Sequence, residues 1–141
     1  MRRVLIAAMM VAAIGAHAQQ SHGRWISSSD TDEMTDEVTD IAMTQHAGGE
    51  AMLAVFNADD LVLISTSVVS FDSRMHVRID NRDVQTYEPI VDSTLAMVDD
   101  YNIDELRGAE RILVRVSTVR GQATYEFSGD GIDEAFEAHG W

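Results

Sequence analysis

Several segments of the chain alternate between hydrophobic and polar residues, as strands do when one face is buried and the other is in water. Segments 74–80, 111–117 and 122–127 follow this pattern. Arg120 and Gly121 form a turn signal between the last two segments. We therefore expect these two segments to pair as an antiparallel hairpin, with a register set by the burial of one face.

Two other segments, 51–56 and 61–67, are nearly continuous in apolar residues. A short apolar run of this kind is typical of a strand that is covered on both faces. The residues between them, Asn-Ala-Asp-Asp at 57–60, are typical of a tight turn. This pair is therefore expected at the centre of a sheet, and a further strand is expected at 38–44.

Helical signals are few. Residues 102–109 are expected to form two helical turns, and a second helix is expected near the C-terminus, with Asp130 as its N-cap and Gly140 as its end. Residues 27–40 are rich in Ser, Thr, Asp and Glu and are expected to be extended and solvated. Together these features predict a mostly β fold, either a β-sandwich or a β-rich α+β fold, with antiparallel sheets and one or two short helices including a C-terminal helix.

The N-terminus has the three parts of a cleavable signal peptide. Arg2 and Arg3 precede an apolar run at 4–14, and Ala16-His17-Ala18 supplies the small residues that signal peptidase reads. The apolar run is about 11 residues long, which is short of the roughly 20 that span a membrane as a helix. The sequence therefore predicts a signal peptide at 1–18, cleavage between Ala18 and Gln19, one domain at 19–141, and a periplasmic or secreted location.

The chain is strongly acidic, with ten basic and 24 acidic residues. Two of the ten basic residues lie in the signal peptide, so residues 19–141 carry a formal net charge of −16 (8 − 24). Such a charge repels nucleic acid and anionic membranes, and it attracts a cationic protein or a divalent cation. The chain has no lysine and no cysteine, which excludes Schiff-base and phosphate-loop lysines, thiol nucleophiles and thiolate metal sites.

The polar faces of segments 74–80 and 111–117 carry basic side chains. If the two segments share a sheet, five such side chains lie on one face. Arginine is favoured at interfaces because its planar guanidinium binds a carboxylate through two hydrogen bonds. The alternative is that the arginines only pair with neighbouring acids such as Asp80 and Glu126. The candidate partner-binding residues are Arg74, His76, Arg78, Arg111 and Arg115.

No catalytic, cofactor-binding or metal-binding residue is predicted. Residues 30–40 space their aspartates in part like a calcium loop, but Met34, Thr35 and Ile41 occupy positions where an EF-hand needs an acid, a glycine and a glutamate. A solvated acidic segment is the preferred interpretation, and divalent-cation binding there stays open. The histidines lack zinc-site spacing, and no nucleophile elbow, zinc-protease motif or phosphate loop occurs.

The order of short motifs along residues 19–141 is similar to that of a known family. Trp25 precedes an acidic segment at 32–38, residues 77–81 read Val-Arg-Ile-Asp-Asn, and Phe127-Ser-Gly precedes a short helix and the terminal Trp141. This layout resembles the small periplasmic accessory proteins of type VI secretion clusters, the VasI/TagO-like family, although this chain lacks the cysteines that members usually carry. The resemblance implies an accessory or binding role without enzymatic activity.

The function expected from these observations is a non-enzymatic periplasmic accessory domain that binds a protein partner of the cell envelope, without a cofactor and without nucleic acid. An acidic inhibitor or immunity-type protein for a cationic hydrolase is the alternative, because the charge of −16 sits on a small exported domain. A hydrolase that uses a pair of carboxylates is a third interpretation, because 24 acids leave many pairs available. The sequence does not fix the partner or the oligomeric state.

Overall fold

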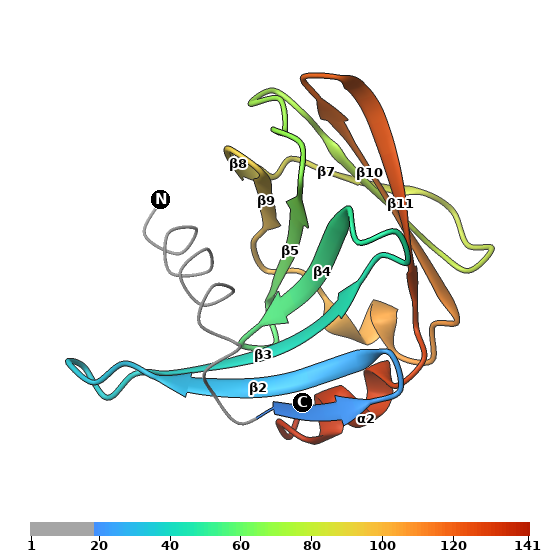
Figure 1. The fold of residues 1–141 in the computed structure, drawn as a ribbon. Coiled ribbons are helices and arrows are strands. Elements are labelled where there is room, and N and C mark those ends of the chain that lie inside the picture. The colour runs from blue at the N-terminus through green and yellow to red at the C-terminus, as the bar shows by residue number, and fades with distance from the viewer. Residues whose placement is uncertain (1–18) are drawn as a thin grey trace.

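The computed structural model describes residues 19–141, and the predicted signal peptide lies outside these residues. The described chain forms two antiparallel sheets, which confirms the mostly β fold. Figure 1 shows the smaller sheet standing against one side of the larger one. The smaller sheet has four strands, in the order β11 (Gly121–Ser128), β10 (Arg111–Thr118), β6 (Met75–Ile79) and β7 (Gln85–Tyr87). The larger sheet has seven strands, in the order β1 (Gln19–His22), β2 (Trp25–Thr31), β3 (Val38–Gln45), β4 (Ala51–Phe56), β5 (Asp60–Ser65), β9 (Leu95–Val98) and β8 (Ile90–Asp92).

Two short helices complete the described chain. A 3-10 helix, η2 (Ile103–Leu106), connects β9 to β10, and an α-helix, α2 (Ile132–Glu137), follows β11. In Figure 1, α2 lies beside β1 and β2 at one end of the sheets. No helix within residues 19–141 has the length and the apolar composition to cross a membrane.

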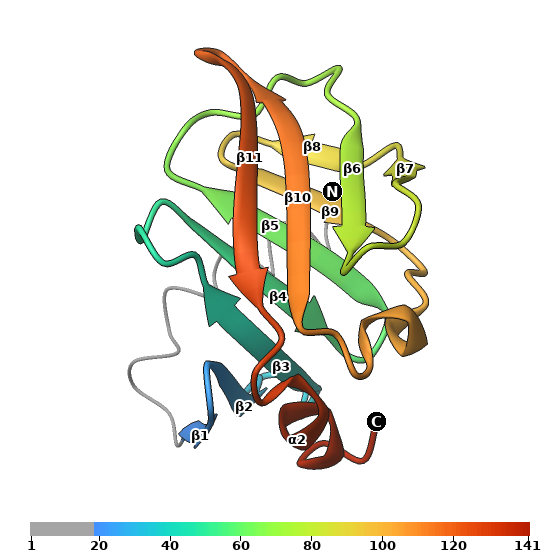
Figure 2. The same ribbon diagram turned by 90° about the vertical axis from the view of Figure 1, so that its right-hand side faces the viewer.

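The main core lies between the two sheets. Figure 2 shows β6, β10 and β11 crossing the strands of the larger sheet at a marked angle. Leu53 and Leu63 from the larger sheet pack with Val77 and Val114 from the smaller one, and all four side chains are buried. Val77 and Val114 are inward positions of the alternating pattern, and all four side chains lie inward because burial removes their apolar surface from water. The predicted hairpin of β10 and β11 and the predicted alternation of β6 are therefore confirmed.

The larger sheet also carries apolar side chains on its other face, as expected for β4 and β5. The second cluster of buried side chains comes from strands β3, β4, β5 and β9, and partly buried residues of β2, β4 and β5 pack against it. We call this surface the outer face. Its buried members are Ile41, Met43, Ala54, Phe56, Val62, Leu95 and Met97.

The prediction that residues 27–40 are extended is confirmed for their first part, which lies in β2, but the prediction that this part is solvated is wrong. β2 pairs with β3 along its whole length, and Ser27 and Ser28 are buried. The sequence pattern does not reveal this strand because many of its side chains are small and polar. In the structure the buried Ser27 has a hydrogen-bond partner, since its Oγ lies 2.9 Å from Nε2 of His22. The connection between β2 and β3 is exposed throughout, and there Asp32 Oδ1 accepts a hydrogen bond from the Met34 backbone N–H (2.7 Å).

The helix boundaries also differ from the expectations. Two helical turns were expected at 102–109, but the helix that forms is shorter and covers only η2. The side chain of Asn102 caps it by accepting a hydrogen bond from the backbone N–H of Asp104 (3.2 Å). The N-cap of α2 is Gly131, with φ of 89°, and not Asp130. A glycine is required at this position because a Cβ would overlap the backbone carbonyl of His22.

Candidate functional site

The solvent face of the smaller sheet brings most of the predicted basic residues together. Arg115 lies directly opposite His76, and Leu113 lies opposite Arg78, in the pairing of β10 with β6. Arg78 and Arg115 are therefore diagonal neighbours on one face, a relation that corresponds to about 7–8 Å in an antiparallel pair. The expectation that segments 74–80 and 111–117 share a sheet is confirmed.

A shallow hollow of about 330 Å³ lies on this face, and we call it the basic groove. It holds two arginines and one histidine but no carboxylate, in a chain with 24 acids. Leu113 and Val84 give it an apolar part. The residues that line the basic groove are His76, Arg78, Val84, Leu113, Arg115, Gln122 and Thr124.

Neighbouring strands hold two of the basic side chains in place. The Nε–H of Arg115 donates a hydrogen bond to Oγ1 of Thr124 on β11 (2.8 Å). On the other side, Nδ1 of His76 lies 3.0 Å from Oγ1 of Thr86 on β7. The guanidinium of Arg115 has five N–H groups, so its hydrogen bond to Thr124 leaves its two terminal nitrogens for a ligand. The arrangement suits the bidentate recognition of a carboxylate.

The other two predicted residues do not belong to the groove. Arg111 forms an ion pair with Glu126 (3.3 Å), and both side chains are about half exposed (50% and 56%). The alternative interpretation, cross-strand pairing, therefore holds for Arg111. Arg74 is exposed just before β6 and does not line the groove. Asp80 has a backbone role instead, since its Oδ1 accepts hydrogen bonds from two N–H groups at the start of β10 (2.9 Å each).

Four groove residues were not predicted from the sequence. Val84 lies just before β7, and its placement depends on the pairing of β6 with β7, which the chain pattern does not reveal. Gln122 and Thr124 lie on the polar side of β11, so the predicted hairpin of β10 and β11 already indicated their side of the sheet. Leu113 does leave a signal, because it is an apolar residue on the otherwise polar side of β10.

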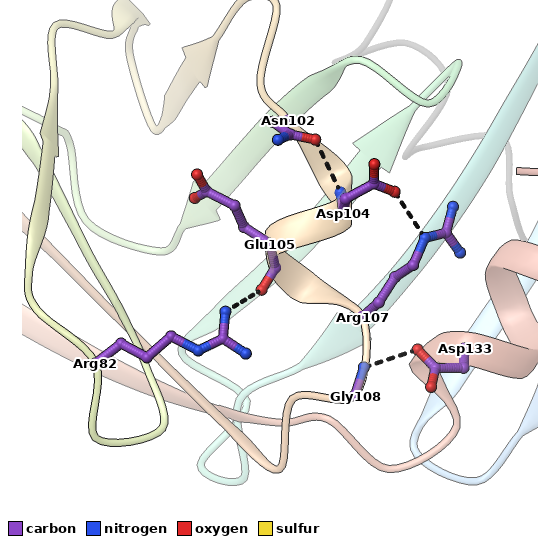
Figure 3. A network of polar contacts seen from close by, with 7 residues as sticks. All are labelled: Arg82, Asn102, Asp104, Glu105, Arg107, Gly108 and Asp133. Atoms are coloured by element: carbon purple, nitrogen blue, oxygen red, sulfur yellow. Dashed lines mark hydrogen bonds and ion pairs between the residues drawn. The ribbon is translucent and has the colours of Figure 1, made fainter.

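A second polar region surrounds η2 and serves the fold. Figure 3 shows the guanidinium of Arg82 reaching from the β6–β7 connection to the backbone carbonyl of Glu105 (3.2 Å). Arg107 Nε donates a hydrogen bond to Oδ1 of Asp104 (2.8 Å), and the Gly108 N–H donates one to Oδ1 of Asp133, at the start of α2. These contacts tie η2 to its neighbours, and the adjoining hollow measures only about 160 Å³.

The hydroxyls of two tyrosines near η2 are harder to ionise than usual. Burial raises the pKa of Tyr101 well above its ordinary value, and the nearby Tyr87 and Glu105 act in the same direction. Burial also raises the pKa of Tyr87, together with the negative charge of Glu105. The rings of the two tyrosines meet edge to face, with centroids 5.5 Å apart. Both groups are neutral at physiological pH and act as packing residues.

The other three histidines in residues 19–141 also contact polar groups of the protein itself. His22 contacts Ser27 (2.9 Å), His46 contacts the Glu126 carbonyl (2.9 Å), and His139 contacts the Ile41 carbonyl (2.9 Å). No group of three or more His, Asp or Glu side chains within the described residues converges in a way that could hold a metal ion.

Comparisons with known proteins bear on the fold. No family model matches the sequence, and no curated protein matches it significantly. Among solved structures, the chain is similar to the crystal structure of invasion associated protein B from Bartonella henselae, with a TM-score of 0.59 and 10% sequence identity. The similarity covers 86% of this chain and 93% of that chain, and at this identity it concerns the fold alone.

Proposed function

We propose that this chain is a non-enzymatic protein-binding domain of the bacterial cell envelope, and that its basic groove binds an acidic segment of a protein partner. The observation that carries the proposal is the separation of charge. His76, Arg78 and Arg115 line one hollow without a carboxylate, while residues 19–141 have a formal charge of −16. A ligand approaching this molecule meets positive charge on that patch and negative charge over most of the remaining surface.

The chemistry of the groove favours a peptide with carboxylate side chains over a polyanion. Nucleic acid brings many phosphates, which the acidic surface around the groove repels. An isolated carboxylate next to an apolar side chain fits better, because the arginines supply paired donors and Leu113 with Val84 supplies apolar contact. Such recognition uses side chains on strands, which hold them more rigidly than loops would.

The envelope location rests on the predicted signal peptide at 1–18, and the accessory role rests on the resemblance to the type VI secretion family. The fold is shared with a protein whose name associates it with invasion, which is consistent with a role outside the cytoplasm. None of these three observations requires a catalytic group. The absence of lysine and cysteine from the sequence agrees with a binding role.

The proposal is tested by a binding titration with the exported protein. The probe is a short fluorescent peptide in which glutamates alternate with valines and leucines, and the matched control peptide carries glutamine in place of glutamate. Fluorescence anisotropy should show binding of the acidic peptide alone. Replacing both groove arginines (Arg78→Gln with Arg115→Gln) should weaken binding by about tenfold or more, because each exposed substitution removes bidentate donors without disturbing the core.

A matched substitution separates the groove from general charge effects. Arg24→Gln removes one exposed arginine at the turn between β1 and β2, in the other sheet, and should leave the affinity unchanged. Equal binding of the two peptides, or equal affinity of the groove variant and the parent, would contradict the proposal. Tight binding of a basic hydrolase such as lysozyme, unaffected by Arg78→Gln and Arg115→Gln, would favour the inhibitor alternative.

A further inference from the structure

The strand β11 provides the longest sheet edge in the part of the chain that the structure describes. Four strands stand at the edges of the two sheets, namely β1, β7, β8 and β11. β11 has eight residues, and each of the others has three or four. Figure 2 shows β11 as the outermost strand of the smaller sheet. An edge strand presents backbone N–H and C=O groups with which a strand of another chain can pair.

The register of β10 with β11 determines which residues face this edge. On the side of β10 that lies away from β11, the Ser117 carbonyl accepts a hydrogen bond from the Ser70 N–H (2.9 Å). Opposite residues of an antiparallel pair direct their backbone groups either toward each other or away from each other, and the two kinds alternate. Ser117 lies opposite Gln122, and Arg115 lies opposite Thr124. Gln122 and Thr124 therefore direct their N–H and C=O groups away from β10 and toward the edge.

The fold itself covers the second half of this edge. Glu126 and Ser128 face the same side, by the same alternation. The Glu126 carbonyl accepts a hydrogen bond from Nδ1 of His46 (2.9 Å), and the Ser128 carbonyl accepts one from Nε1 of the buried Trp25 (2.8 Å). Side chains that cover an edge in this way hinder the addition of another strand. The part of the edge that follows Tyr125 is therefore closed.

The first half of the edge is open and borders the basic groove. Within the described residues, no backbone hydrogen bond joins Gln122 or Thr124 to a neighbour on this side, and both residues are exposed. Their side chains line the basic groove. The hydrogen bond from Arg115 Nε to Thr124 Oγ1 (2.8 Å) draws the guanidinium over β11, which is the direction of the edge. Residues 121–124 contain no acid, so these positions of β11 do not repel an acidic chain.

We infer that the acidic segment of the partner binds as an added antiparallel strand along residues 122–124 of β11. This inference rests on the proposed function and adds the conformation and the register of the ligand. Directly opposite residues of an antiparallel pair carry their side chains on the same face. Ligand residues opposite Gln122 and Thr124 therefore present their side chains to the basic groove, and carboxylates at these positions meet the Arg115 guanidinium.

The ligand residues between these carboxylates face the other side of the smaller sheet. On that side, Ala123 is partly buried and packs against the main core. Apolar side chains of the ligand extend the core past the edge of the sheet. In this mode of recognition, backbone hydrogen bonds supply affinity and alternate side chains supply specificity. The ligand is therefore an extended segment of about five residues, about 17 Å long, in which carboxylate and apolar side chains alternate.

A second copy of this chain fits the open edge less well than an acidic segment does. Two copies joined through residues 122–124 would set two basic grooves side by side. They would also bring together two domains that each have a formal charge of −16. Both arrangements are repulsive. An acidic segment meets positive charge at the edge instead, so charge complementarity selects it as the occupant.

The test compares three versions of the peptide in which glutamates alternate with valines and leucines. In an added antiparallel strand, the glutamates direct their backbone N–H groups at β11, and the valines and leucines direct theirs away from it. One version carries N-methyl groups on two central glutamates, and its matched control carries them on two central apolar residues. In fluorescence anisotropy, methylation of the glutamates should weaken binding by about tenfold or more, and methylation of the apolar residues should change it by less than about twofold.

Amide hydrogen exchange, followed by NMR, locates the added strand on the protein. The unmethylated peptide at saturation should slow exchange of the Gln122 and Thr124 amides by about tenfold or more. The Ala123 amide faces β10 already in the free protein and should change little. Binding of the unmethylated peptide reports on the proposed function separately.

Three results would overturn the inference while leaving the proposed function intact. The two methylated peptides could bind equally well, the preference between them could be reversed, or the exchange of the Gln122 and Thr124 amides could stay unchanged. Failure of the unmethylated peptide to bind would overturn both proposals. A dimer of the free protein in sedimentation, with the same two amides protected, would also overturn the inference, because a second copy would then be the occupant.

Discussion

The hydrogen bond between Ser65 and Tyr125 connects the two sheets through the core, and its removal should have a measurable and unequal cost. Ser65 Oγ on β5 lies 2.7 Å from the hydroxyl of Tyr125 on β11, and both residues are buried (4% and 5% exposed). Ser65 Oγ also accepts a hydrogen bond from the Ser67 N–H (3.1 Å). The bond therefore fixes β11, the strand that supplies Gln122 and Thr124 to the basic groove.

The two substitutions leave different groups without a partner. Tyr125→Phe removes one hydroxyl, but Ser65 Oγ keeps its contact with Ser67, so the cost should be about 1 kcal/mol, the net value of one hydrogen bond. Ser65→Ala leaves the buried Tyr125 hydroxyl and the Ser67 N–H unsatisfied, so its cost should be about 2 kcal/mol. The double variant should lose about as much as Ser65→Ala alone, because the tyrosine hydroxyl is no longer present to be left unpaired.

Urea unfolding followed by circular dichroism measures the free energies of unfolding of the parent and the three variants, and the double-mutant cycle gives the coupling energy. The expected coupling energy is about 1 kcal/mol. Additive costs, with a coupling near zero, would refute the claim that these residues form a hydrogen bond across the core. A cost of Tyr125→Phe that exceeds the cost of Ser65→Ala would refute the role assigned to Ser67.

Three further predictions follow from other parts of the fold. Gly131→Ala should destabilise the protein by about 3 kcal/mol or more, because φ is 89° and a Cβ would overlap the backbone of β1. Gly140→Ala, at φ of 72° with free space around it, should cost about 1 kcal/mol. Thermal melts compare the stabilities of the two variants. Because the pKa of the Tyr101 hydroxyl is raised in the folded protein, the unfolded chain loses the hydroxyl proton first as pH rises above about 10. The free energy of unfolding should therefore fall from that pH upward. The urea midpoint of Tyr101→Phe should fall less over the same pH range than the midpoint of the parent protein. Arg111→Gln should change the free energy of unfolding by less than about 0.5 kcal/mol, since its ion pair with Glu126 is half exposed, and a larger loss in urea titration would count against this.

The alternating strands were predictable because their pattern depends only on which face is buried. β6, β10 and β11 lie close to where the alternation of Val77, Val114 and Phe127 with polar neighbours puts them. β2 was missed because Ser27 and Ser28 look like loop residues, and their burial follows from packing between β1 and β3. The short strands β7, β8 and β9 were missed because three or four residues are too few to establish a period.

The candidate site was predictable in part for the same reason. Alternation alone places Arg78, Arg115 and His76 on one face, and the structure brings them into one groove. The sequence names Glu126 as a partner for the arginines, but it does not tell which arginine takes it, because Arg111 and Arg115 both lie diagonal to Glu126 in the pairing of β10 with β11. The outer face was likewise indicated only at β4 and β5, because its full extent depends on which strands become their neighbours.

The central claim, that the basic groove binds an acidic segment, is tested most directly by mapping the contact on the protein itself. We would label the protein with ¹⁵N, titrate it with the glutamate-containing peptide and follow the amide and arginine Nε resonances. The account predicts that the largest shifts occur at Arg78, Leu113, Arg115 and Thr124, and that they vanish with the glutamine control peptide. Shifts centred on another surface, or none at concentrations that saturate binding, would contradict it.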